Sequence, residues 1–296
     1  MEENKHFSEI TVVDYRVFKD LTFKNLSKIN LIVGENNTGK TAFLEAVGLL
    51  IGQNVINNLD VIYTSRWKFL HRLSSKQYLH TQLKDELDGE SKKVTIKGIY
   101  DNKESEFKIE GYHEEGVDSK DINRNEYLFT LKLTSIKNGE KRIGKSRIFL
   151  NPDPIFNSEK ESDPLCKYWI TNSFRIIDEN NKRILYEQAK KEGLYEEIIE
   201  FIKINIDPKI EDITHLPLSE RFFVTPSKLD LTSYGEGLQK IYFTAMMFAA
   251  AKNGVVLIDE LENGIHVDLL AKFIGFIFKL ADEFNVQVFF TTHSQE

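Results

Sequence analysis

Cysteine is almost absent from this chain, since Cys166 is the only one among 296 residues. A single thiol excludes an intrachain disulfide and a zinc site built from cysteines. The N-terminus is charged and no apolar run follows it, so we find no secretory signal peptide. These features predict an intracellular, cytoplasmic protein.

Long apolar runs are lacking as well. The longest covers residues 241–251 and is interrupted by Thr244, whereas a membrane-spanning helix needs about 20 apolar residues. We therefore expect a buried helix at this place and no membrane partner.

The chain has fewer basic than acidic residues, with 39 Lys and Arg against 46 Asp and Glu, which gives a formal net charge of −7. Proteins that coat nucleic acid passively are usually basic, so that class loses support. One basic cluster remains, made of Lys137, Lys141, Arg142, Lys145 and Arg147. A solvated hairpin is the favoured interpretation of such a charge run, and nucleic acid is kept as an alternative partner.

The most informative feature that is present is the segment 34–41, which fits the pattern G-x-x-x-x-G-K-[ST] at every fixed position. A predicted buried strand at Ile29–Val33 precedes it and a predicted helix to about Gly52 follows. Backbone N–H groups and a helix N-terminus arranged in this way bind a phosphate chain. We expect Lys40 to reach the β- and γ-phosphates and the Thr41 hydroxyl to ligate Mg²⁺. The full predicted phosphate-binding set is Gly34, Glu35, Asn36, Asn37, Thr38, Gly39, Lys40, Thr41 and Ala42.

A second motif lies near the C-terminus, where the apolar stretch 255–258 ends in Asp259 and Glu260. Acids at the carboxyl end of a central strand face the edge at which a phosphate loop opens. We expect Asp259 to hold Mg²⁺ and Glu260 to polarise the attacking water. A further strand ends at His293, and the 33 residues between Glu260 and His293 (293 − 260) leave room for one helix. The two strands can then be neighbours, with His293 near the γ-phosphate.

A third motif, the segment 233–240, leads into a predicted helix at 238–252. Small residues with free N–H groups at a helix N-terminus form a second anion site, here Ser233, Gly235 and Gly237. The pattern of apolar residues predicts an opening hairpin at 7–23, a β-meander at about 92–150 and a helical stretch at about 181–206. It also predicts short strands near 210–216 and 221–225, a helix at 267–284 and a last strand at 286–291. A Ras-type GTPase is excluded, because no N-K-x-D motif occurs and the nearest match, Asn102-Lys103-Glu104-Ser105, lacks the Asp.

Together these motifs resemble the ABC-type ATPase head in the branch shared by SMC, RecF and the OLD nucleases. The Asn36-Asn37 loop, Asp14-Tyr15-Arg16-x-Phe18 and the segment 259–266 are similar to that branch, in particular to small OLD-like ATPases of prokaryotic anti-phage systems. Segment 233–237 is similar to a diverged signature motif, and Thr292-His293-Ser294 to the switch-histidine loop. The resemblance implies an α/β P-loop NTPase with a mixed central sheet and flanking helices. It also implies a homodimer or higher homo-oligomer in which ATP lies between one chain's phosphate loop and the other chain's Ser233 and Gly235.

Three departures limit the resemblance. First, 193 residues separate Lys40 from Ser233 (233 − 40) and they carry no heptads, which rules out a chromosome-clamping arm. Second, the Q-loop glutamine stays open among Gln53, Gln77 and Gln82. Third, the sequence stops three residues after His293, where OLD nucleases continue into a Toprim domain. We expect either a piece of a longer protein or a nuclease or other effector on a separate chain.

The motifs divide the chain into three segments. Residues 1–53 form the N-terminal part of the head, 54–220 an inserted α+β region with the meander at about 92–150 and helices at about 179–206, and 221–296 the C-terminal part. Three functions are weighed: a Mg²⁺-dependent ATPase switch that controls an effector, a RecF-like head that binds DNA directly, and a scaffold that binds ATP without hydrolysing it.

Overall fold

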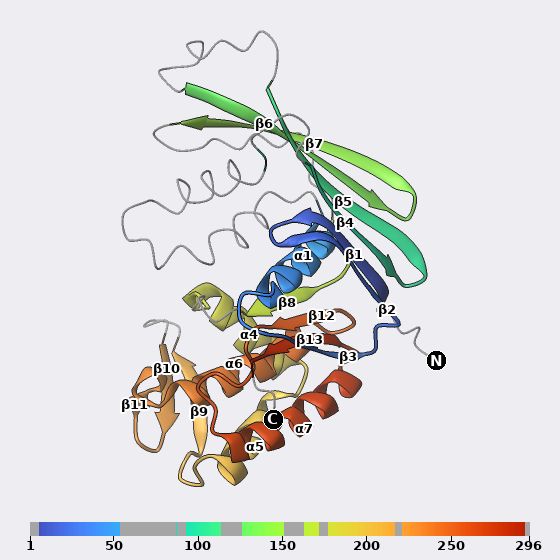
Figure 1. Ribbon diagram of the computed structural model, residues 1–296. Coiled ribbons are helices and arrows are strands. Elements are labelled where there is room, and N and C mark those ends of the chain that lie inside the picture. Colours follow the sequence, from blue (N-terminus) through green and yellow to red (C-terminus); the bar gives the residue numbers. More distant parts are fainter. Residues whose placement is uncertain are drawn as a thin grey trace. The chain divides into compact units, whose positions relative to one another are not determined.

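The structure is a computed structural model, and it describes residues 6–53, 87, 93–113, 126–150, 163–171, 177–216 and 221–293. The sequence also predicts a partly helical stretch at 54–87 and a loop at 151–163, and both lie outside the described residues apart from Leu87 and Asp163. By contacts the chain divides into two compact units (Figure 1). One comprises residues 1–27 and 36–166, the other residues 28–35 and 167–296. The three segments drawn from motif positions stay a prediction.

The first unit is built on a six-stranded antiparallel sheet of order β2-β1-β4-β5-β6-β7, with helix α1 packed on it. The opening hairpin and the meander, both predicted, therefore belong to one sheet, joined where β1 pairs with β4. Val12, Ile96 and Phe107 are neighbours across three strands and are all buried. The elements are β1 (Phe7–Tyr15), β2 (Phe18–Lys24), α1 (Lys40–Gly52), β4 (Lys93–Tyr100), β5 (Lys103–Tyr112), β6 (Glu126–Lys137) and β7 (Glu140–Leu150).

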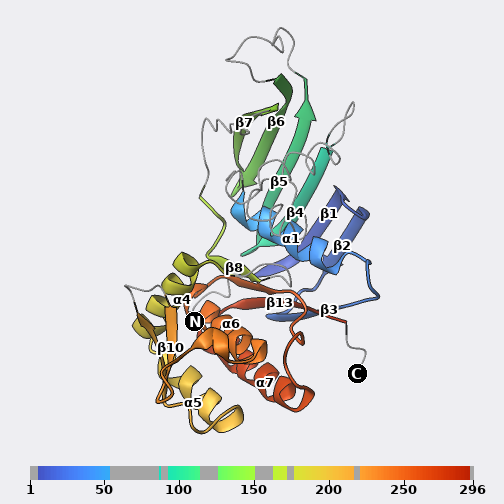
Figure 2. The ribbon, with the colours of Figure 1, turned by 90° about the vertical axis from the view of Figure 1, so that its left-hand side faces the viewer.

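The second unit is built on a four-stranded parallel sheet of order β3-β13-β12-β8, and helices α6 and α7 lie on one face of it (Figures 1 and 2). A small antiparallel sheet of order β11-β10-β9 and the helices α4 and α5 complete the unit. The elements are β3 (Ile29–Val33), β8 (Tyr168–Thr171), α4 (Glu179–Lys191), α5 (Tyr195–Asn205), β9 (Asp212–Leu216), β10 (Arg221–Thr225), β11 (Leu229–Asp230), the 3₁₀ turn η2 (Leu231–Ser233), α6 (Glu236–Ala250), β12 (Val255–Ile258), α7 (Val267–Glu283) and β13 (Gln287–Thr292).

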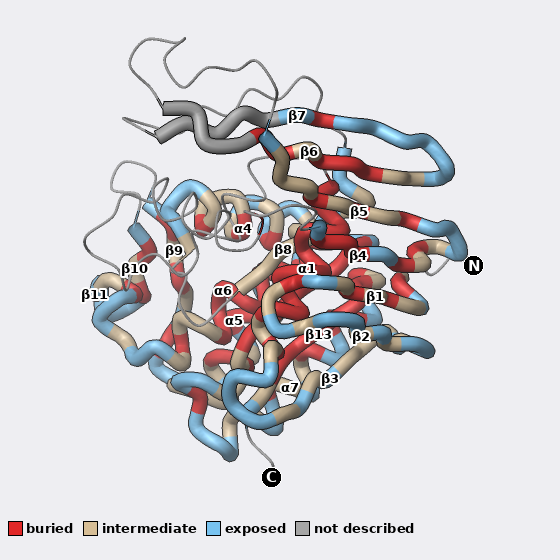
Figure 3. The backbone as a smooth tube through the Cα atoms, turned by 45° about the horizontal axis from the view of Figure 1, so that its top comes forward, coloured by how far each residue is buried: buried red, intermediate tan, exposed pale blue. Residues whose placement is uncertain are grey.

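The core of the second unit draws on the helices α4, α5, α6 and α7 and on the strands β12 and β13, and Figure 3 colours the buried residues red. β12 is buried along its whole length, as expected of a central parallel strand. The apolar run at 241–251 lies in the buried part of α6 and in the turn after it, which confirms the expectation of a buried helix. No helix in the described ranges is long and apolar enough to cross a bilayer.

One expectation about these elements was wrong. Ile29–Val33 is a strand but not a buried one, because Leu31 and Val33 are 52% and 54% exposed. The reason is that β3 lies at an edge of the described sheet, beside β13 alone. The helical stretch expected at about 179–206 is made of two helices, because Gly193 adopts a φ of +78° and ends α4. The Leu194 N–H then donates to Ala189 O (3.0 Å) and the Gly193 N–H donates to Lys190 O (3.3 Å). This pair of hydrogen bonds is typical of a helix that ends at a glycine C-cap.

Candidate functional site

The phosphate loop starts at the end of β3 and leads into α1. The boundary between the two units falls inside it, between Glu35 and Asn36. Asn37 and Gly39 both have left-handed backbones, with φ of +61° and +98°. Such a succession of conformations turns backbone N–H groups toward one side, which is how phosphate loops form an anion site. Gly39 is the N-cap of α1, and Lys40, Thr41 and Ala42 form its first turn.

Gly39 is required at its position for space as well as for conformation. A Cβ atom there would lie 2.5 Å from Val17 Cγ2 and 2.6 Å from Phe18 Cζ. The turn between β1 and β2 therefore rests directly on the phosphate loop. A second contact is made by Arg16 in the same turn, whose Nε lies 3.1 Å from the Glu45 carboxylate on α1. The opening hairpin thus holds the start of α1 in place.

Gln53, one of the three Q-loop candidates, lies at the wrong end of α1 for a role at the phosphates. It is the C-cap residue, it is buried, and its side-chain amide donates to Leu50 O. A helix of 13 residues is about 20 Å long, which separates Gln53 from the first turn by that distance. The other two candidates lie outside the described residues.

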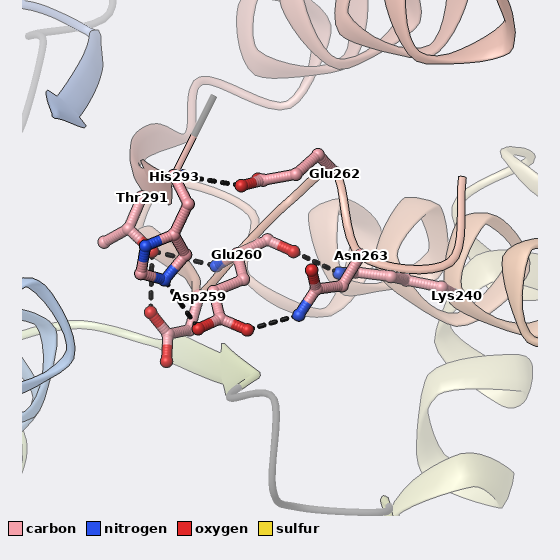
Figure 4. A network of polar contacts seen from close by, with 7 residues as sticks. All are labelled: Lys240, Asp259, Glu260, Glu262, Asn263, Thr291 and His293. Atoms are coloured by element: carbon pink, nitrogen blue, oxygen red, sulfur yellow. Dashed lines mark hydrogen bonds and ion pairs between the residues drawn. The ribbon is translucent and has the colours of Figure 1, made fainter. Parts of the chain in front are cut away.

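The carboxylates predicted at the end of β12 meet the end of β13, as Figure 4 shows. The parallel pairing of β12 with β13 confirms that the two strands are neighbours. Asp259 is 2% exposed, and its Oδ1 accepts a hydrogen bond of 2.6 Å from the Thr291 hydroxyl. The same hydroxyl oxygen accepts the Glu260 N–H at 2.8 Å. Thr291 therefore connects both predicted acids to the neighbouring strand.

Glu260 and His293 are brought together directly. His293 Nε2 lies 2.7 Å from Glu260 Oε1, and Asn263 donates its amide N–H to Glu260 Oε2. The His293 backbone N–H donates to Glu262 Oε1 at 2.6 Å, which fixes the histidine at the strand end. The Glu260 side chain is 18% exposed and the His293 side chain 36% exposed. A half-open carboxylate paired with an imidazole can orient a water molecule and accept its proton.

Sequence reasoning missed four members of this cluster. Thr291 was treated only as a strand residue, Glu262 and Asn263 only as part of a family segment, and Lys240 only as part of the signature region. Lys240 comes from α6, and its ammonium donates to Glu260 O. Asn263 follows Glu260 at a spacing typical of a tight turn, which is a usable signal. For Thr291 and Lys240 the sequence carries no such signal, because their contacts cross between elements.

The three predicted signature residues differ in their surroundings. Ser233 ends η2, and Gly235 is the N-cap of α6. Both are exposed, and a Cβ on Gly235 would meet no atom within 4 Å. Gly237 instead packs closely, since a Cβ there would lie 2.4 Å from Gly264 O. Gly235 is thus open to a ligand, whereas Gly237 joins α6 to the loop that follows β12.

The acids suit Mg²⁺ better than a metal held by protein alone. Among the described residues no group of three or more His, Cys, Asp or Glu side chains could hold a metal ion. Mg²⁺ typically takes one or two carboxylates and fills its remaining positions with phosphate oxygens and water. The buried carboxylate of Asp259, at the end of β12, fits that pattern of donors.

The basic cluster lies on the β6–β7 hairpin. Lys137 donates to Pro164 O at 2.9 Å, and Arg142 lies 3.8 Å from Glu140. Part of its charge is therefore engaged within the protein, which supports the solvated hairpin over a nucleic-acid surface.

The fold and its two motifs are those of an ABC-type ATPase head, and the chain hydrolyses ATP. Residues 29–296 match a family model described as "AAA domain, putative AbiEii toxin, Type IV TA system", and the chain belongs to this family. A curated relative from Helicobacter pylori, named "ATP/GTP phosphatase", is 28% identical over 335 residues, covering 97% of this chain and 85% of the relative.

Solved structures with a similar fold include RecF with ATP and an SMC head. The structure titled "Structure of the recombination mediator protein RecF-ATP in RecFOR pathway" is 13% identical with a TM-score of 0.45, covering 98% of this chain and 94% of that chain. The SMC head bound to the C-winged helix domain of ScpA is 12% identical with a TM-score of 0.49, covering 98% and 90%.

Proposed function

We propose that this ATPase is a Mg²⁺-dependent switch that dimerises around ATP and controls an effector, in a prokaryotic system directed against phage. The observation that carries the hydrolytic part is the contact between Glu260 and His293, with Asp259 tied to the same strand end by Thr291. The family description, which names a toxin of a type IV TA system, supports a role in acting on another molecule.

In this proposal Glu260 is the general base. Its carboxylate accepts a proton from the attacking water, and His293 fixes the orientation of that carboxylate from 2.7 Å away. Lys40 and the loop N–H groups hold the phosphates, and Thr41 and Asp259 hold Mg²⁺. The ion would neutralise charge on the β- and γ-phosphates. Ser233 and Gly235 contact the nucleotide of a second copy, and their exposure is what such a contact requires.

The test is Glu260→Gln, which keeps the size of the side chain and removes its basicity. We expect kcat to fall by about 10² to 10⁴-fold, the range for loss of a general base. ATP binding should persist, and light scattering should show a doubled mass in ATP and Mg²⁺, because the bound nucleotide is no longer consumed. Both ATP and GTP are assayed, since the relative's name includes both.

The matched control is Glu283→Gln, at the exposed end of α7. It should retain wild-type turnover. If Glu260→Gln turns over ATP at the wild-type rate, the role of Glu260 is wrong. If hydrolysis is lost but the mass never changes with ATP, the dimeric switch is wrong while the catalytic assignment stands.

A further inference from the structure

The backbone of Glu260 has an unusual conformation, with a φ of +49°. This left-handed region costs a residue with a side chain about 1 kcal/mol or more, and it persists only where the surroundings hold it. Residues in such conformations concentrate at functional sites. The contacts that hold Glu260 therefore bear on how its carboxylate is placed.

Both backbone polar groups of Glu260 are held by neighbours (Figure 4). The N–H donates to the Thr291 hydroxyl at 2.8 Å. The C=O accepts the Asn263 N–H at 3.0 Å and also the Lys240 ammonium. The Asn263 contact belongs to the same local turn. Thr291 and Lys240, in contrast, fix the residue from β13 and α6.

Lys240 is the one charged group among these backbone contacts. Hydrogen bonds from a charged donor are roughly twice as strong as those between neutral groups. Burial lowers the pKa of Lys240 to about 8, against the charges of Glu262, Glu260 and Asp259, which raise it. The side chain is half-buried and lies near the three carboxylates of Asp259, Glu260 and Glu262. The Lys240 ammonium therefore contacts the loop that follows β12, through the Glu260 carbonyl.

We propose that Lys240 is a positioning residue, which holds the left-handed backbone of Glu260 so that the carboxylate stays in contact with His293. This inference rests on the proposed role of Glu260 as the base. It predicts that Lys240 affects the chemical step and leaves nucleotide binding alone. It also predicts that the effect of Lys240 passes entirely through Glu260.

A double-mutant cycle tests this with Lys240→Met, Glu260→Gln and the pair together. Met matches Lys in length and in helix propensity, so α6 should be kept. We expect Lys240→Met to lower kcat by about 10 to 100-fold, as for other residues that orient active-site ligands. The dissociation constant for ATP should change by less than about twofold. The double variant should be no slower than Glu260→Gln alone, because residues acting as a unit are non-additive.

Lys240→Arg, which restores a charged donor, should recover activity relative to Met. Lys252→Met, just after α6 and paired with Glu192 on the surface, is the control and should behave as wild type. If Lys240→Met does not fold, Lys240→Gln takes its place, since its neutral, shorter side chain also fails to reach Glu260 O.

Normal kcat in Lys240→Met overturns the inference, as does weakened ATP binding without loss of kcat. The inference is also overturned if Lys240→Met lowers kcat by the same factor in the Glu260→Gln background as it does in the wild-type protein. If instead Glu260→Gln keeps wild-type turnover, the assignment of Glu260 as the general base is wrong. That result differs from a failure of the Lys240 inference alone, in which Glu260→Gln still loses activity.

Discussion

The ion pair between Arg16 and Glu45 makes a strong prediction about what holds the phosphate loop. Arg16 Nε lies 3.1 Å from Glu45 Oε2, and the two side chains are 10% and 1% exposed. Arg16 also donates to the Tyr15 hydroxyl at 3.1 Å. We predict that Arg16→Met markedly destabilises the fold, because it removes the cation that lies 3.1 Å from the buried Glu45 carboxylate.

The magnitude follows from the distance and the burial. Two unit charges 3.1 Å apart attract by about 5 kcal/mol at an effective dielectric constant of 20. Desolvation of both ions offsets most of that attraction, so the intact pair adds little net stability. Removing Arg16 loses the attraction, while the Glu45 carboxylate keeps its own desolvation cost. Breaking a buried pair in this way typically destabilises a protein by about 3–5 kcal/mol. Replacing both charges with Met should recover most of this loss.

The assay is urea unfolding followed by far-ultraviolet circular dichroism for wild type, Arg16→Met, Glu45→Met and the double variant. We expect about 3–5 kcal/mol lost from the free energy of unfolding in Arg16→Met and a double variant within about 2 kcal/mol of wild type. Both substitutions keep long, unbranched side chains, so packing on α1 changes little. A loss below about 1 kcal/mol in Arg16→Met, or losses that simply add in the double variant, would refute the reasoning.

Two further predictions concern glycines and the thiol. Gly237→Ala should destabilise by about 1–3 kcal/mol, because its Cβ would lie 2.4 Å from Gly264 O, whereas Gly235→Ala meets no atom and should stay within about 0.5 kcal/mol of wild type. Urea unfolding measures both, and the reverse order would contradict the packing. Burial raises the pKa of the half-buried Cys166 thiol to about 12, so at pH 8 its thiolate is far rarer than that of an exposed thiol. Iodoacetamide should label it far more slowly in the folded protein than in urea, and equal rates would contradict this burial.

Much of the site could be predicted because the chemistry is local in the chain. A phosphate loop needs a strand, glycines and a helix start within about a dozen residues, and the segment from Ile29 to Gly52 has all three. The pairing of β12 and β13 was also predictable, since one helix fits between Glu260 and His293. The strand β8 was missed, although Tyr168–Thr171 is aromatic and β-branched, because four residues give too short a pattern to separate from a loop.

What could not be predicted depends on contacts between elements far apart in the chain. Lys240 reaches the Glu260 carbonyl across 20 residues, and Thr291 reaches its N–H across 31. No periodicity reports such contacts. The exposure of β3 is of the same kind, because an apolar pentapeptide looks alike in the middle and at the edge of a sheet. The break at Gly193 was predictable in principle, since a glycine followed by an apolar Leu194 is the pattern of a helix C-cap.

The left-handed conformation of Glu260 has a geometric reason. Successive side chains of an extended strand point to opposite faces, so Asp259 and Glu260 would diverge if β12 continued. Thr291 and His293, two residues apart near the end of β13, are suited to meet groups on one side. Turning the backbone at Glu260 brings both neighbouring carboxylates to that side, one on Thr291 at 2.6 Å and the other on His293 at 2.7 Å. The strain at Glu260 is therefore what allows two consecutive acids to serve one site. It follows that Glu260→Gly, which relieves the strain but removes the carboxylate, should stabilise the fold while abolishing hydrolysis.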